Sequence, residues 1–463
     1  MKWCRLILLL LVLVIIVPNF ADASEYIIQT DQIESLDDLS NLHVIEDMQH
    51  GGYFLVEYEG SLEEIKALPK ILTAEDNSEI LLLTTTTIEK HLGLGPDSDW
   101  GKEFLDFKSL IYGAKPVRIA IIDTGIDVNH PDLKQHIDPG ISVLEEEPEV
   151  QDQHGHGTKI AGIVTGSSPE SIRILPIKAL NATGKGTLYS IVAGLYAAID
   201  ANVDLINISF GSKSNSKMLQ DTVEAVHAEG IGMIAATGNA GQESLLYPAR
   251  YSVVSAVGSI NQNSQSSHFS NWGEGLDFLA PGEKVLTSKI GGGYVETSGT
   301  SLSAAYITKM AAALLSQRTI KPSEIKNELK EATNYAFEPY TLERGYGLPI
   351  TKRLNYRSLL IKLINTDIVK SVMTINDSSK SWNITFSEVV ENSSLTNKTI
   401  IITSNDTVVP IEITINGSQV IVKPKESYQP NELYTLHVSN PIYSANGKKL
   451  AKTVVQPFIF KPE

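Results

Sequence analysis

The chain has 463 residues, which at about 150 residues per domain suggests roughly three folded units. Hydrophobic residues make up 42% of it and charged residues 20%, as in ordinary globular proteins. The formal net charge of -16 argues against nucleic acid or an anionic membrane as a partner.

The N-terminus has the features of a secretory signal peptide. Two basic residues flank the start of an apolar run, 6–17, and residues 21–23 (Ala-Asp-Ala) form a small-x-small cleavage site. A membrane anchor is the alternative, but a helix needs about 20 apolar residues to span the hydrocarbon, and this run has twelve. We therefore expect residues 1–23 to be removed. Cys4, the one cysteine, would leave with them, which excludes disulfides and thiol catalysis in the mature chain.

The segment 24–93 is strongly acidic. It carries 15 Asp and Glu against three Lys, so most of the net charge lies here. Residues 53–58 and 80–83 have strand patterns, and 62–68 has helical spacing. This combination predicts a small α+β module. The stretch 93–101, rich in Gly, Pro, Asp and Ser, is expected to be an exposed linker.

Between residues 100 and 354, short β-rich apolar runs alternate with helical stretches. This alternation predicts a parallel sheet with helices on both of its faces. The expected strands are 117–122, 172–178, 203–209, 230–236 and 253–257, and the expected helices are 187–201 and 217–229.

From about residue 366 the pattern changes to short strands separated by turn residues, such as Asn446-Gly447. This spacing predicts an all-β sandwich of about 100 residues. The expected strands are 382–386, 399–403, 411–415, 420–424, 433–438 and 455–460.

Asp123 directly follows the predicted buried strand 117–122. In an open parallel sheet, functional sites form at the carboxyl ends of the strands, so this position favours a role in a site. A loop aspartate that caps a turn would give the same local pattern.

His156 lies between two glycines, before an apolar run that is compatible with a helix. A catalytic histidine needs one ring nitrogen free for a nucleophile and the other held by a carboxylate. The glycines let neighbouring backbone approach closely. Metal binding by Asp152, His154 and His156 is the competing interpretation, but no further His, Cys or Glu lies at ligand spacing.

Ser301 stands after the small residues 297–300 and at the start of an apolar helix that runs to about Leu315. Backbone N–H groups and the positive end of the helix dipole lie near such a position, although a hydroxyl here can also simply cap the helix. Asn239 follows an apolar strand and lies among glycines. It suits either a turn or an amide donor aimed at a developing oxyanion.

The order Asp, His, Ser along the chain is that of the subtilisin triad. With the Asn239 motif, the stretch 100–354 resembles the subtilisin-like serine proteases. The segments 203–211 and 247–250 are also similar to segments of that family.

The resemblance implies a role for each motif. Ser301 would be the nucleophile, His156 the general base, and Asp123 the residue that orients the imidazole and stabilises its cation. Asn239 would be the oxyanion donor, together with the backbone N–H of Ser301.

The same resemblance implies that two segments pair with an extended peptide substrate as flanking strands. Leu188 lies where the family often has an aromatic residue at the border of a distal subsite. The flanking segments are Gly184, Lys185 and Gly186 on one side and Ser209, Phe210 and Gly211 on the other.

The chain also departs from the family. Ala305 and Tyr306 stand where a proline and a histidine are usual, and Lys159 stands where a histidine is usual, from which we expect altered packing and no loss of activity. The stretch 163–174 is too short for the usual loop that binds a tight calcium ion. Asp132 matches a calcium-ligating aspartate, but calcium takes about six to eight oxygens, so a structural calcium ion stays an open alternative. The chemistry itself needs no cofactor.

The expected fold is α/β: a subtilisin-like parallel sheet with helices on both faces, preceded by a small α+β propeptide and followed by an all-β sandwich that resembles bacterial Ig-like domains. The expected boundaries are 1–23 for the signal peptide, 24–93 for the inhibitory propeptide, 94–358 for the peptidase domain and 365–463 for the Ig-like sandwich.

The expected function is that of a secreted serine endopeptidase, made as a self-inhibited zymogen that cuts off its own propeptide. Its expected partners are polypeptide substrates and the propeptide, not nucleic acid. Contact with the cell wall or cell surface through the Ig-like domain stays open. Two alternatives remain: a processing protease with one secreted precursor as its substrate, and a catalytically silent surface adhesion protein.

Overall fold

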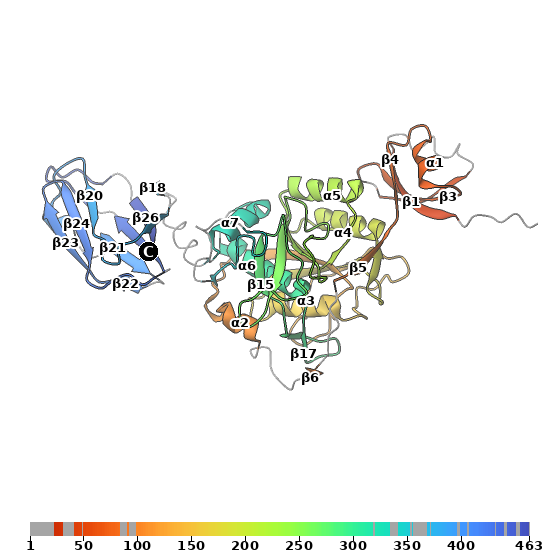
Figure 1. Cartoon of the computed structure of the whole chain (residues 1–463), viewed down its shortest axis with the longest axis horizontal. Coiled ribbons are helices and arrows are strands. Elements are labelled where there is room, and N and C mark those ends of the chain that lie inside the picture. The colour runs from red at the N-terminus through yellow and green to blue at the C-terminus, as the bar shows by residue number, and fades with distance from the viewer. Residues whose placement is uncertain are drawn as a thin grey trace, which may run out of the picture. The chain divides into compact units, whose positions relative to one another are not determined.

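The structure, a computed structural model, describes residues 23–30, 41–48, 50–83, 90–91, 99–317, 320–333, 341–351, 354, 368–370, 372–395, 399–404, 407–430, 432–438, 442–450 and 454–462. Almost all of the expected signal peptide and most of the expected linker lie outside these residues. The chain forms two compact units: residues up to Glu79 with 187–189, and the remainder (Figure 1). No helix in the described part of the chain is long and apolar enough to cross a membrane.

The smaller unit contains a four-stranded antiparallel sheet and one short helix, α1 (Leu62–Lys66). The Ser61 side chain accepts a hydrogen bond from the backbone N–H of Glu64, and the Glu64 carboxylate accepts one from the backbone N–H of Ser61. This capping box starts the helix, and Ile65 buries its apolar side in the core of the unit. The strands, in sheet order, are β2 (Leu42–Asp47), β3 (Tyr53–Tyr58), β1 (Ser24–Gln29) and β4 (Thr73–Asp76).

The larger unit is built on a seven-stranded sheet whose neighbouring strands all pair in parallel. The predicted fold class is therefore confirmed, and β9 matches its predicted range residue for residue. In sheet order the strands are β15 (Phe278–Pro281), β14 (Ser255–Ile260), β13 (Gly232–Ala236), β11 (Leu205–Ile208), β7 (Val117–Asp123), β9 (Ile172–Lys178) and β8 (Ile141–Ser142).

Helices cover both faces of this sheet, with α4 and α5 on one side and α3 and α6 on the other (Figure 1). Helix α6 is buried almost along its whole length, because it packs on the central strands and against α3. The helices are α2 (Trp100–Phe104), α3 (His156–Thr165), α4 (Leu188–Asp200), α5 (Lys217–Ala228), α6 (Thr300–Gln317) and α7 (Ile325–Glu331).

Two small sheets lie at the edges of the larger unit. One has the order β10-β5-β12 and the other β16-β17-β6. The six strands are β10 (Lys185–Thr187), β5 (Glu79–Leu82), β12 (Phe210–Gly211), β16 (Val285–Ser288), β17 (Tyr294–Thr297) and β6 (Lys90–His91).

The C-terminal part is all-β, as predicted, with two sheets around a core of aromatic and aliphatic side chains. In this core Trp382 lies with its ring centroid 4.5 Å from that of Phe458. The larger sheet comprises β18 (Ile368–Val369), β26 (Val454–Phe460), β25 (Leu433–Val438), β21 (Ile400–Ser404) and β22 (Thr407–Val409), with β19 (Met373–Ile375) also on β26; the smaller comprises β20 (Trp382–Thr385), β24 (Gln419–Pro424) and β23 (Ile411–Asn416).

Candidate active site

Asp123 and His156 meet where β7 ends and α3 begins. His156 Nδ1 lies 2.8 Å from Asp123 Oδ1 and 2.9 Å from Oδ2. Both residues are buried, and the backbone N–H of Thr124 donates a further 2.8 Å hydrogen bond to Asp123 Oδ1. Because Nδ1 faces the carboxylate, Nε2 is the ring nitrogen that is available to a nucleophile.

A glycine allows α3 to start this close to the end of β7. A Cβ atom at Gly157 would lie 2.1 Å from the carbonyl oxygen of Gly125, which no side chain could accommodate. The carboxylate of Asp152 holds the first turn of α3 in place. Its two oxygens accept hydrogen bonds from the backbone N–H groups of Gly155 (2.7 Å) and Thr158 (3.0 Å).

The Asp152 carboxylate is occupied by the protein itself. It also accepts hydrogen bonds from the hydroxyls of Thr124 (2.9 Å) and Thr158 (2.7 Å). Its oxygens are therefore not directed at a metal shared with His154 and His156. In the part of the chain that the structure describes, no group of three or more His, Cys, Asp or Glu side chains could hold a metal ion.

Ser301 is the second residue of α6, and its side chain is buried. Its hydroxyl donates toward the carbonyl oxygens of Leu83 (3.3 Å) and Ser209 (3.4 Å). The described structure has no hydrogen bond between Ser301 and His156. The hydrogen bond between a nucleophile and its base is often long or poorly aligned until the reacting complex forms.

The side-chain amide of Asn239 donates a 2.7 Å hydrogen bond from Nδ2 to the same Leu83 carbonyl oxygen. Its Oδ1 accepts hydrogen bonds from the backbone N–H (2.9 Å) and the hydroxyl (2.8 Å) of Thr300. These two bonds fix the orientation of the amide, so that its N–H₂ group faces Leu83. Sequence reasoning missed Thr300, although it directly precedes Ser301.

The chain's own segment 80–83 lies between the two predicted substrate-binding strands. Strand β5 pairs antiparallel with β12 and lies between β12 and β10. The backbone N–H of Leu82 donates to the carbonyl oxygen of Gly184, and that of Leu83 donates to Ser209, both at 3.3 Å. A strand at 80–83 was predicted as part of the small N-terminal module. In the structure it belongs to the sheet β10-β5-β12 and not to the small N-terminal sheet.

The other predicted substrate-contacting residues are placed as follows. Gly186 is buried and Lys185 is exposed, whereas Phe210 is buried and Gly211 is half-buried beside it. Leu188, expected at a distal subsite, is buried at the first position of α4.

His154, which the sequence offered only as an alternative metal ligand, stands beside the cleft as a second histidine. Its ring centroid lies 6.4 Å from that of His156. Its Nδ1 is buried without a hydrogen-bond partner. Burial, and then the neighbouring His156, lower the pKa of His154 below its ordinary value, which favours the neutral imidazole.

Two of the residues that depart from the family pattern, Ala305 and Tyr306, pack in the interior. The hydroxyl of Tyr306 is fully buried and donates to the carboxylate of Asp99. Asp99 in turn caps α2, accepting hydrogen bonds from the backbone N–H groups of Gly101 and Lys102. Ala305 is also buried. Tyr306 therefore ties α6 to the start of α2.

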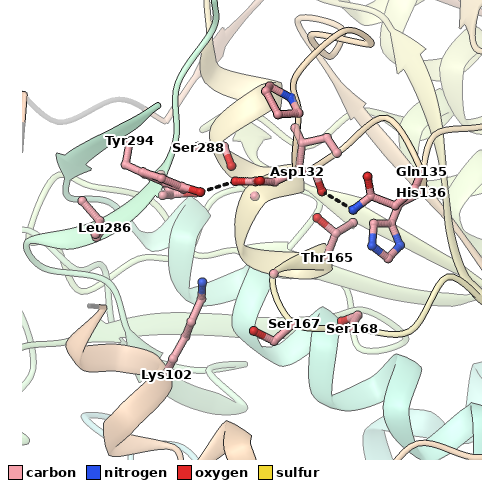
Figure 2. Close-up of a pocket in the computed structure, with 15 residues that line it drawn as sticks. Lys102, Asp132, Gln135, His136, Thr165, Ser167, Ser168, Leu286, Ser288 and Tyr294 are labelled. Carbon is pink, nitrogen blue, oxygen red and sulfur yellow. Dashed lines mark hydrogen bonds between the residues drawn. The ribbon is translucent and has the colours of Figure 1, made fainter. Parts of the chain in front are cut away.

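Asp132, which matches a calcium-ligating aspartate of the family, lines a cavity of about 260 Å³ at the end of α3. Figure 2 shows its carboxylate facing Tyr294, whose hydroxyl donates to it, with Lys102 lining the same cavity. A lysine ammonium group repels a cation, and the Tyr294 bond already engages the carboxylate.

Lys309 joins the same end of α3 to α6. Its Nζ donates to the carbonyl oxygens of Val164 (3.3 Å) and Gly166 and to the hydroxyl of Ser168 (2.9 Å). Burial lowers the pKa of Lys309 well below its ordinary value. In the sequence, a single lysine within an apolar helix was the signal that could have indicated this contact.

Comparison with known proteins agrees with this geometry. Residues 114–348 match the subtilase family and residues 364–461 match a bacterial Ig-like domain. The chain is 33% identical over 286 residues to the thermostable alkaline protease of Halalkalibacterium halodurans, covering 59% of this chain and 74% of that protein. It is 38% identical over 225 residues to subtilisin BL of Lederbergia lenta, covering 46% and 82%. It is 36% identical over 244 residues to the alkaline elastase YaB of a Bacillus species, covering 50% and 62%.

Proposed function

The chain belongs to the subtilase family and is a serine endopeptidase, and from this premise we propose that Ser301, His156 and Asp123 are its catalytic triad. The observation that carries the proposal is the buried contact of His156 Nδ1 with both oxygens of Asp123. We assign Asn239 as the oxyanion donor, because its amide already binds a peptide carbonyl beside Ser301.

In this mechanism His156 Nε2 takes the proton of Ser301 as the hydroxyl attacks the substrate carbonyl. Asp123 holds the neutral imidazole in the Nδ1–H tautomer and then stabilises the imidazolium ion. Asn239 Nδ2 donates to the oxyanion, and Thr300 keeps its amide aimed. His156 then returns the proton to the leaving amine, and water hydrolyses the acyl-enzyme. The reaction needs no cofactor.

We also propose that the protein is made as a zymogen. The acidic N-terminal segment would be an intramolecular inhibitor, because its residues 80–83 lie between the two strands with which a substrate would pair. The residues at the N-terminus that resemble a signal peptide support export from the cell. For the C-terminal Ig-like domain, contact with the cell surface or cell wall stays an open alternative.

We propose further that Asp132 does not bind calcium. The hydrogen bond from Tyr294 supports this, since it already engages the Asp132 carboxylate, and Lys102, which lines the same cavity, adds a positive charge there.

Hydrolysis of a mixed peptide library tests the enzyme mechanism. Purified wild-type protein is expected to cut peptides and to lose this activity after treatment with a reagent that phosphorylates or acylates serine. Ser301→Ala should be inactive but folded. Equal activity of the wild type and Ser301→Ala would rule out the assigned nucleophile, and cutting of only one precursor would favour the narrow processing protease.

A further inference from the structure

The segment 80–83 lies in the cleft in the register of a substrate. Backbone hydrogen bonds hold it on both sides, and the last carbonyl oxygen of the segment, that of Leu83, contacts both Asn239 Nδ2 (2.7 Å) and Ser301 Oγ (3.3 Å). In acyl transfer the oxyanion forms on the carbonyl that is attacked. Leu83 therefore occupies the position of the residue that donates the acyl group.

We propose that the peptide bond between Leu83 and Thr84 is the bond that the enzyme cuts to mature, and that aliphatic side chains at the first, second and fourth positions before the cut are the sequence that it selects. This proposal rests on the proposed function. It moves the end of the propeptide ten residues upstream of the expected boundary at 93, and it names the residue with which the mature chain begins.

The sequence selectivity is inferred from which side chains of the segment 80–83 are buried. Ile80 is 2% exposed, Leu82 8% and Leu83 8%, whereas Leu81 is 48% exposed. In an extended strand successive side chains point to opposite faces, so Ile80 and Leu82 enter the protein on one face. Leu81 and Leu83 lie on the opposite face of the segment. There Leu81 is exposed, whereas Leu83 is buried. The protein therefore covers one side chain on that face, next to the catalytic serine, and leaves the third position before the cut free.

Gly184 lies beside both the Leu82 side chain and the ring of His154. A Cβ atom at Gly184 would lie 2.9 Å from Leu82 Cδ1 and 3.2 Å from His154 Nε2. A glycine here makes room for the branched side chain. The neutral form of His154, which burial favours, presents no charge to an aliphatic residue. Gly184 and the neighbouring His154 therefore border the second position before the cut.

The cleavage step follows from the same contacts. The Ser301 hydroxyl oxygen bonds to the carbonyl carbon of Leu83, and its proton passes to His156. The Leu83–Thr84 C–N bond then breaks, and His156 gives the proton to the amine of Thr84. Water hydrolyses the ester, so that Leu83 ends as a carboxylate and Ser301 regains its hydroxyl.

The test is to express the full chain and to measure the ends of both products by mass spectrometry and N-terminal sequencing. We expect a released segment that ends at Leu83 and a mature chain that begins at Thr84. A released segment ending elsewhere, from a protein that hydrolyses peptides, would overturn this inference and leave the proposed function intact. A chain that neither cuts itself nor hydrolyses any peptide would overturn the proposed function.

Two matched substitutions test the selectivity. Leu83→Asp should slow maturation at this bond by at least about 100-fold, because it places a charge in an apolar pocket, whereas Leu81→Asp should mature at close to the wild-type rate. Both positions leave with the released segment, so the mature enzyme is the same molecule in each case. Equal rates for the two variants would contradict the proposal.

A tetrapeptide library gives a second measurement that does not depend on folding of the variants. Mature wild-type enzyme should prefer aliphatic residues at the first, second and fourth positions before the cut and accept most residues at the third. A library profile without this pattern would overturn the assigned selectivity.

Discussion

Asn239 donates its 2.7 Å hydrogen bond to Leu83 across 156 positions of sequence. The amide is not free to turn, because Thr300 holds its oxygen through two hydrogen bonds. In the proposed mechanism the donor is therefore already in place before charge develops on the carbonyl, which is how electrostatic preorganisation lowers a barrier.

Replacing Asn239 with Ala should reduce kcat by about 100- to 1000-fold with little change in KM, which is the size of effect known for this donor in a subtilisin. Steady-state kinetics on a peptide substrate, with the mature enzyme, measure both constants. A large rise in KM at unchanged kcat would mean that Asn239 binds the ground state and the transition state equally.

Thr300→Val should lower kcat by a smaller factor, about 10-fold, because one of the two bonds that orient Asn239 is lost. Thr300→Ser keeps the hydroxyl and should restore activity. A Thr300→Val enzyme whose thermal stability falls while kcat is unchanged would show that Thr300 has only a structural role.

Asp123→Asn should lower kcat by about 10⁴-fold, because an amide favours the wrong histidine tautomer. Asp132→Asn is the matched control, since it removes a carboxylate at the far end of α3. It should keep kcat within about 2-fold of the wild type. Comparable losses in the two variants would mean that a general loss of charge or of folding explains the effect.

Because we propose that Asp132 binds no calcium, removal of calcium by a chelator should leave the melting temperature of the mature protein unchanged. With excess EDTA and with millimolar calcium, differential scanning fluorimetry is expected to give the same Tm. Tyr294→Phe should be less stable by about 1 kcal/mol, since a hydrogen bond to a half-buried carboxylate is lost. A Tm that rises with calcium in the wild type and no longer does so in Asp132→Asn would contradict the proposal.

The Ig-like domain should lose stability in mild acid through His437. Burial lowers the pKa of His437 to about 4, against an ordinary value near 6.5. Between these values the unfolded chain binds a proton that the folded domain does not, so stability falls as pH falls from 6.5 toward 4. The expected loss between pH 7 and pH 5 is about 2 kcal/mol.

Hydrogen exchange of β25 in the full chain, corrected for intrinsic rates, measures this loss. His437→Gln has no titrating group at this position and should show a smaller dependence on pH. The same dependence in both proteins would assign the effect to other groups.

Local sequence patterns determined which secondary-structure elements this protein forms, and they identified the candidate catalytic residues. Alternating apolar runs gave the parallel sheet, with β9 predicted over its full range, because burial on both faces of a parallel strand leaves a continuous apolar run. Short strands such as β8 and β15 were not predicted, because two to four residues are too few to show a period. Four short motifs supplied Asp123, His156, Asn239 and Ser301.

Only the tertiary structure decided which distant groups meet. The run 80–83 reads as a strand, but its sequence does not specify its neighbours, because strand partners are chosen by backbone hydrogen bonds and by surfaces that other parts of the chain provide. Thr300 beside Asn239 and Lys309 at the end of α3 were hidden for the same reason. Each acts through atoms that lie more than 60 positions away in sequence, and such contacts exist only once the chain has folded.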